Sequence, residues 1–165
     1  MPSCTPHRFA PRLFAPLLLT LALLLATLPA RAAPLPGIEV LASKHDYATL
    51  LARTEAAIKD NKMGHLFTAS ATVGAKARGV TIPGNAVVMV FRPDYAIRML
   101  AASIDAGIEA PLRLYVTEEK DGTARISWRR PTAVFAPYGV PALDAMATEL
   151  DPILARIAAQ AAGGS

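Results

Sequence analysis

The hydrophobic and polar positions between residues 38 and 162 predict an alternation of short strands and amphipathic helices. The pattern centres on residues 85–116, which predict a strand, a helix and a second strand separated by two breaks. Residues 86–91 are apolar at both alternate sets of positions, which is typical of a strand inside a covered sheet. Arg92 and Pro93 end this strand, because proline cannot donate to a strand ladder.

The next helix is predicted to begin at Pro93 or Asp94 and to end at Gly107. Its apolar stripe, at helical spacing, contains Ile97, Leu100, Ala101 and Ile104. Arg98 is expected on the outer side of this helix.

The residues before this central unit predict a strand, a helix and a second strand. Residues 38–43 alternate as a first strand, and Asp46 is expected to cap a helix that runs to about Lys62. Gly64 is expected to end that helix, because glycine takes the left-handed conformation without steric cost. Residues 65–73 predict the second strand, and residues 74–78 a loop or a single helical turn. The apolar stripe of the helix is Tyr47, Leu50, Leu51, Thr54 and Ile58.

The residues after the central unit predict a β-hairpin and a long helix. Strands at 112–118 and about 124–129 are joined by Asp121-Gly122, a strong hairpin signal, and should pair antiparallel with one wet face. Residues 131–141 are expected to form a loop. A final helix covers about 142–162, and Pro152 should kink or split it, with Asp151 able to cap a second segment.

The first 32 residues have the order of a cleavable secretory signal peptide. A basic segment with Arg8 and Arg12 precedes the uncharged apolar residues 13–28, and Ala30-Arg31-Ala32 is a small-x-small cleavage pattern. The alternative is a membrane anchor, but this run of about 16 residues is shorter than the roughly 20 needed to span a bilayer. We therefore expect cleavage after Ala32, export to the periplasm, a flexible leader at 33–37, and no membrane span in the mature chain.

Removing this segment changes the charge and the cysteine content of the chain. Without Arg8, Arg12 and Arg31, the 17 basic residues become 14, against 13 acidic residues. This near-neutral balance lacks the clustered basic footprint that nucleic-acid binding needs. The single cysteine, Cys4, is also removed, which excludes disulfides and thiol chemistry. About 133 of the 165 residues remain, enough for one domain at 38–162 with one core.

The mature chain resembles the bacterial domain-of-unknown-function 302 family. The resemblance rests on Lys62-Met63-Gly64, the apolar strand at 87–91 closed by Pro93, Ala-Pro-Leu-Arg-Leu at 110–114, and Asp121-Gly122 before a strand with Trp128. It implies a single α+β domain with a largely antiparallel sheet of about five strands and its helices on one face. It implies no reaction, because the family has no assigned activity.

This chain departs from the family pattern at three places. Members have Phe-Gly-Asn-Pro where this chain has Phe91-Arg92-Pro93, and Leu-Pro where it has Ala110-Pro111. Many members also carry an Asp-His pair in the second strand region, and residues 70–72 of this chain have neither residue. Any chemistry carried by that pair would be missing here.

The hairpin strands carry a candidate anion-binding face. In the predicted pairing, Arg113 and Tyr115 project from the same face as Arg125, Ser127 and Arg129. Arginine forks match the geometry of carboxylates and phosphates, and Arg130 and Tyr138 lie nearby in the sequence. The alternative is a solvated face balanced by Glu118, Glu119 and Asp121.

Two histidines and a methionine form a second candidate site, for a metal or haem iron. His45 and His65 are the histidines of the mature chain, and Met63 lies close to His65 in the sequence. Two histidines without a third ligand at a characteristic spacing are a weak metal signal. The methionines are more simply core fillers.

These observations lead to three functional hypotheses. The first is an exported, non-enzymatic domain that binds a small ligand or a protein of the cell envelope, since no catalytic constellation is recognisable. The second is a metal- or haem-binding protein that uses His45, His65 or Met63. The third is an enzyme whose polar site lies on the 112–130 hairpin. The sequence leaves the ligand, any cofactor and the oligomeric state open.

Overall fold

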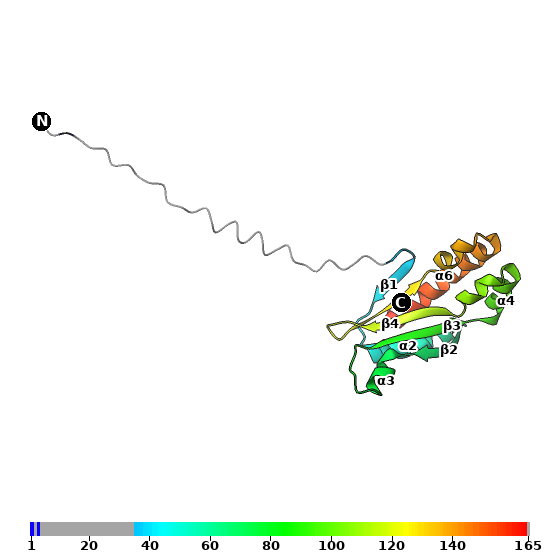
Figure 1. The fold of residues 1–165 in the computed structure, drawn as a ribbon, viewed down its shortest axis with the longest axis horizontal. Coiled ribbons are helices and arrows are strands. Elements are labelled where there is room, and N and C mark those ends of the chain that lie inside the picture. Colours follow the sequence, from blue (N-terminus) through cyan, green and yellow to red (C-terminus); the bar gives the residue numbers. More distant parts are fainter. Residues whose placement is uncertain (2, 4–34, 165) are drawn as a thin grey trace. The chain divides into compact units, whose positions relative to one another are not determined.

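Five strands form one antiparallel sheet in the order β1-β5-β4-β3-β2 (Figure 1). The strands are β1 (Ile38–Ala42), β2 (Gly64–Ala69), β3 (Asn85–Phe91), β4 (Leu112–Glu118) and β5 (Ala124–Arg129). The β4–β5 hairpin occupies the middle of the sheet, and β1 and β2 are its two edges. This arrangement confirms the expected α+β fold with a five-stranded antiparallel sheet.

The coordinates are a computed structural model that describes residues 1, 3 and 35–164. The predicted signal peptide, apart from Met1 and Ser3, therefore lies outside the described residues, as do the first two positions of the predicted leader. Among the described residues, no helix combines the length and the apolar composition that crossing a membrane requires.

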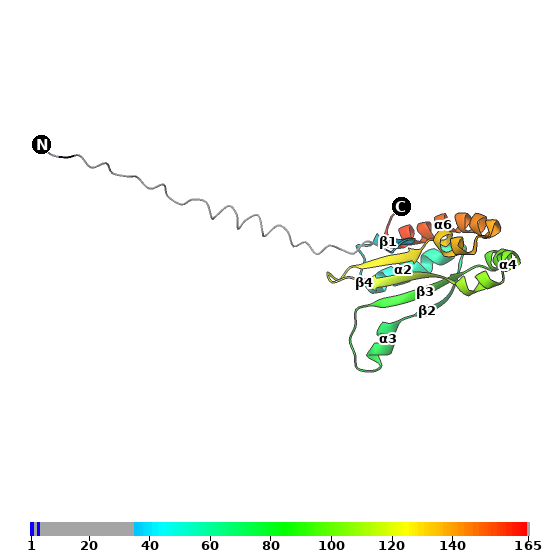
Figure 2. The same ribbon diagram turned by 45° about the horizontal axis from the view of Figure 1, so that its top comes forward.

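Helices cover one face of the sheet (Figures 1 and 2). Helix α2 (Tyr47–Asp60) packs against β3, β4 and β5, and α6 (Pro141–Ala162) packs against α2, β1 and β5. The shorter helical segments are α3 (Ala71–Lys76), α4 (Pro93–Ala102), η1 (Asp105–Glu109), α5 (Pro131–Phe135) and η2 (Ala136–Tyr138). The core lies between the sheet and the α2–α6 layer, where Val88, Leu114, Ile126, Leu50 and Leu154 are fully buried.

The start of α2 forms as the sequence predicts. The main-chain N–H of Thr49 donates to Asp46 Oδ1 over 2.8 Å, so Asp46 is the N-cap. This hydrogen bond is the main reason that the pKa of Asp46 is lowered. The predicted stripe turns inward, with Leu50, Thr54 and Ile58 buried.

The end of α2 differs from the prediction. Lys62, and not Gly64, takes the left-handed conformation, with φ of 57°. The N–H of Met63 donates to the carbonyl of Ile58, and the N–H of Lys62 to the carbonyl of Lys59, which closes the helix in a Schellman motif. Burial of Met63 and Ile58 accompanies this motif, and Gly64 is left free to begin β2.

The second strand is shorter than predicted, and the last helix is not split, which was one of two alternatives for Pro152. β2 ends at Ala69, and α3 occupies residues that were predicted as the end of the strand and as a loop or single helical turn. Helix α6 continues through Pro152, so the helix is not split there. Asp151 instead accepts hydrogen bonds from Thr132 N and Oγ1, at 3.0 and 2.7 Å, and so holds the start of α5 within the predicted 131–141 loop.

The predicted apolar stripe of α4 faces outward. Tyr95 and Met99 are the buried residues of this helix, whereas Ile97 is 69% exposed and Ile104, just after the helix, is 75% exposed. Arg98 is exposed, as expected, and donates two 2.7 Å hydrogen bonds to Glu149 of α6. The Tyr95 and Met99 side of α4 is therefore the side that packs toward the core.

Strand β3 is covered on one face only, although both of its faces are apolar. Ala86, Val88 and Val90 are buried beneath the helices, while Val87 and Met89 on the other face are partly exposed. The prediction of a strand covered on both sides was therefore wrong. The uncovered face, which we call the open face, is where the hairpin arginines lie.

Candidate functional site

The open face is built from three rows of side chains that cross the sheet. Directly paired residues of antiparallel strands project to the same side, so the register defines each row. From β1 to β2, the first row is Ile38, Arg129, Arg113, Met89 and Phe67, and the second is Val40, Ser127, Tyr115, Val87 and Ala69. The third row is Ala42, Arg125, Thr117 and Asn85.

Arg113 and Arg129 lie side by side in the first row. Leu114 pairs with Trp128, so the next position places Arg113 opposite Arg129. Both side chains are exposed, and both line an open pocket of about 250 Å³. Ile38, Val87, Tyr115 and Ser127 also line the pocket on this face, and Trp128, whose side chain belongs to the core, adjoins it. Two cationic groups therefore meet over a surface that is otherwise largely apolar.

A second, smaller pocket adjoins the same two arginines. Its volume is about 50 Å³, and Glu109 of η1, Leu112 of β4 and Val134 of α5 complete its lining. Glu109 accepts a 3.3 Å hydrogen bond from the hydroxyl of Tyr138. Burial and the nearby Glu109 carboxylate raise the pKa of Tyr138, so this tyrosine stays protonated at neutral pH. Helical segments thus border one end of the arginine pair.

Within residues 35–164, neither Arg113 nor Arg129 forms a hydrogen bond or an ion pair through its side chain. Like charges directly opposite each other in a sheet destabilise it. Arginine presents a planar fork of donors that matches a carboxylate or phosphate. The pair is therefore an available binding element for an anion.

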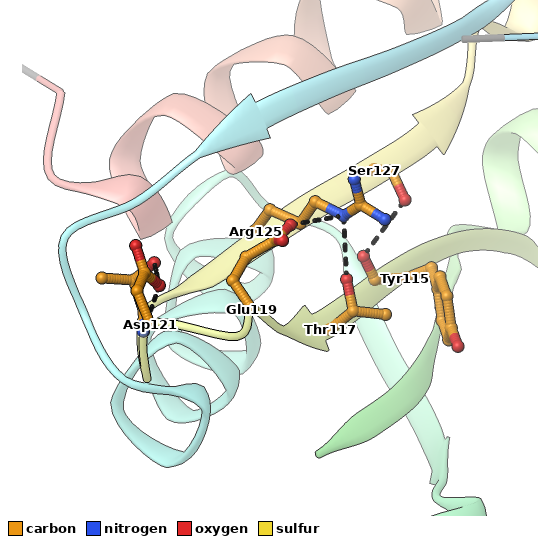
Figure 3. Close-up of polar contacts among 7 residues, drawn as sticks. Tyr115, Thr117, Glu119, Asp121, Arg125 and Ser127 are labelled. Atoms are coloured by element: carbon orange, nitrogen blue, oxygen red, sulfur yellow. Dashed lines mark hydrogen bonds and ion pairs between the residues drawn. The ribbon is translucent and has the colours of Figure 1, made fainter. Parts of the chain in front are cut away.

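Arg125, the third predicted arginine, already has partners inside the protein (Figure 3). Its Nε lies 3.0 Å from Glu119 Oε1 and donates to Thr117 Oγ1 over 3.1 Å. In Figure 3, Tyr115 contributes its main-chain oxygen, which accepts from Ser127 Oγ at 3.4 Å, while its ring extends away from Arg125. Arg125 is thus part of a structural network at the hairpin end of the open face.

The acidic residues that were expected to neutralise the arginines of this face instead form contacts at the hairpin end of the sheet. Glu118 Oε2 accepts from the N–H of Gly84 over 2.6 Å. Asp121 accepts from Thr123 Oγ1 and N, at 2.6 and 3.0 Å, which lowers the pKa of Asp121 and fixes the turn (Figure 3). Arg130, outside the open face, pairs with Glu39 at 3.4 Å. These contacts leave Arg113 and Arg129 as the cations available on this face.

The structure separates the two candidate metal-binding histidines. The carbonyl of His45 accepts from Ala124 at the start of β5, whereas His65 pairs with Val90 near the end of β3. His45 lies on the β1 side of β5, four strand spacings from β2, so at about 4.8 Å per spacing and about 3.3 Å per residue the two lie on the order of 19 Å apart across the sheet and 20 Å along it. They cannot share one ion.

His65 is also hydrogen-bonded within the protein. Its Nε2 lies 2.8 Å from Thr68 Oγ1, and that hydroxyl donates its proton to Glu55 at 2.7 Å. Nε2 must therefore carry a proton and donate. Met63 is 5% exposed in the core. Among residues 35–164, no three His, Cys, Asp or Glu side chains gather as a metal site would require.

Arg113, Tyr115 and Arg129 could be placed at this pocket from the sequence, but its apolar residues could not. Ile38 and Val87 reach it because β1 pairs with β5 and β3 pairs with β4. Alternation within one strand shows that these residues share a face with their own neighbours. It does not show which strand lies beside the hairpin, and so the apolar walls could not be assigned.

The fold and the site define a two-layer α+β domain whose sheet is open on one side. The family described as "Domain of unknown function DUF302" matches residues 39–161, and the chain belongs to this family. Among solved structures, it is similar to the crystal structure of an uncharacterized conserved DUF302 protein from Bacillus stearothermophilus. The TM-score is 0.70 at 23% identity, over 77% of this chain and 99% of that chain. None of the curated proteins matches.

Proposed function

We propose that this protein is an exported, non-enzymatic binding domain that takes up a small anionic ligand on the open face of its sheet. The observation that carries the proposal is the pair Arg113 and Arg129, adjacent on β4 and β5 and without partners among the described residues. Export is supported by the basic, apolar and small-x-small segments of residues 1–32.

The charge arrangement favours a ligand over a structural role. A structural arginine on a sheet surface gains from an acidic neighbour, as Arg125 does from Glu119. Two unpaired arginines side by side carry a repulsion that a bound anion removes. Bidentate contacts to a carboxylate oxygen pair are among the strong hydrogen bonds available to a protein. Ligand binding gives this pair a role that the folded chain alone does not.

Calorimetric titration tests the binding part of the proposal. The ligand is unidentified, so benzoate and phenyl phosphate serve as anionic probes and benzamide as the neutral probe. We expect heat from at least one anion and none from benzamide, with binding lost in the double variant Arg113→Ala/Arg129→Ala. Arg156→Ala, which removes one exposed arginine from α6, is the control for loss of surface positive charge and should bind like the wild type. Equal binding by the double variant, or no anion binding at millimolar concentration, would contradict the proposal.

Export is tested separately by intact mass. The full chain would be expressed in a bacterial host with a periplasm, and the envelope fraction would be analysed. We expect the mass of residues 33–165. Recovery of the full-length mass in the cytoplasm alone would contradict export and leave the binding proposal in place.

A further inference from the structure

Resting on the proposed function, the geometry points to a more specific ligand class: an amphiphilic carboxylate, with its head on Arg113 and Arg129 and its apolar tail across β3 toward β2. The open face carries its cations at one place and its apolar surface beside them. The first row runs from the arginines to Met89 and then to Phe67 at the sheet edge. The second row runs in parallel from Tyr115 to Val87 and Ala69.

This strip is apolar and accessible. The side chains that β2 and β3 contribute to the three rows include no charged group. Phe67 is 61% exposed and Tyr115 is 41% exposed, so two aromatic rings present much of their surface to water. A contiguous exposed apolar patch that is bordered by polar groups is typical of a ligand-binding or interaction site. The distance from β4 to β2 is about 10 Å, two strand spacings, which suits a tail of medium length.

Local charge favours a singly charged head. Two arginines face the site, and Glu109 lies beside them in the smaller pocket. The net local charge is therefore about one positive unit, which one carboxylate neutralises. The same charge argues against a second copy of this chain as the occupant, because a two-fold contact through the open face would bring two arginine pairs together. An anion with an apolar body satisfies both parts of the face.

The test is a chain-length series monitored by calorimetric titration. Butanoate, hexanoate and octanoate would be titrated below their micelle concentrations, with octanol and octylammonium as neutral and cationic tails. A fully buried methylene strengthens binding about fourfold. On an open face we expect roughly half of that free energy, which is about a twofold increase in affinity per methylene. Octanol should bind more weakly than octanoate, and octylammonium should not bind.

Two variants separate this inference from the proposed function. Phe67→Ala should flatten the chain-length dependence while butanoate binding is kept. Ile97→Ala, which shortens an exposed apolar residue on α4, should leave the series unchanged. If short and long carboxylates bind equally well, the amphiphile inference is overturned and the anion site stands. If octyl phosphate binds more tightly than octanoate, the carboxylate head is wrong, and if the Arg113→Ala/Arg129→Ala variant binds octanoate normally, both proposals fail.

Discussion

At the scale of single residues, the site depends on which arginines the protein itself already uses. Arg98, Arg125 and Arg130 each contact a carboxylate of the same chain. Arg113 and Arg129 do not, within the described residues. Some arginines therefore stabilise the fold and others are available to a ligand. The sequence does not distinguish the two kinds; the contacts in the folded chain do.

This division predicts that removing an available arginine stabilises the free protein. Arg113→Ala ends the repulsion with Arg129, and we expect the free energy of unfolding to rise by about 0.2 to 1 kcal/mol. Arg125→Ala breaks contacts with Glu119 and Thr117 and should lower it. Urea unfolding of both variants without ligand checks the two directions. A loss of stability in Arg113→Ala equal to that in Arg125→Ala would show that Arg113 is structural.

Asp46 gives the protein a component of acid sensitivity. Its pKa is lowered from the ordinary value of 3.8, first by the hydrogen bond from the main chain of Thr49. A lowered carboxyl pKa means that the stabilisation is present above the unfolded pKa and is lost as the pH falls through the folded pKa. Asp46→Asn keeps an N-cap acceptor without titrating.

Thermal midpoints measured from about pH 5 to about pH 2 test this assignment. The wild type should lose more of its melting temperature over this range than Asp46→Asn does. Asp121 and Glu149, whose pKa values are also lowered, titrate in both proteins and cancel in the comparison. If the melting temperatures of the two proteins fall in parallel with pH, Asp46 does not contribute to the acid sensitivity.

At the scale of elements, α4 shows why the spacing of hydrophobic residues did not predict which side of the helix is buried. This helix has two apolar sides, one with Tyr95 and Met99 and the other with Ile97 and Leu100. Periodicity finds both sides and cannot rank them. In the folded chain the Tyr95 side is the buried one, and polar contacts accompany it: Arg98 reaches Glu149, and the guanidinium carbons of Arg92 and Arg98 lie 4.2 and 5.5 Å from the centre of the Tyr95 ring.

The orientation of α4 can be checked by paired substitutions. Met99→Ala removes a side chain that is 4% exposed and should lower the free energy of unfolding by about 2 to 5 kcal/mol. Ile97→Ala removes one that is 69% exposed and should change it by no more than about 0.5 kcal/mol. Denaturant unfolding gives both values. A larger loss of stability in Ile97→Ala than in Met99→Ala would show that the Ile97 side is buried, as the sequence predicted.

At the scale of the whole molecule, the family, the α+β fold and most strand positions could be predicted from the sequence. The hairpin register followed from Asp121-Gly122 and from the alternation on either side of it, so Arg113, Tyr115 and Arg129 could be placed on one face. The neighbours of the hairpin could not be predicted, because pairing of β1 with β5 and of β3 with β4 is a long-range choice. That choice supplies Ile38, Val87 and Met89 beside the arginines.

The central claim is that the open face binds an anion at Arg113 and Arg129. The most direct measurement is a map of backbone amide shifts in nitrogen-15-labelled protein, recorded by NMR as octanoate is added. We predict that the largest shifts fall on β4 and β5 around Arg113, Tyr115 and Arg129, with smaller shifts at Met89 and Phe67 and little change on α6. Shifts concentrated on the helix layer or on the exposed side of α4, or no saturable shifts at all, would contradict the account.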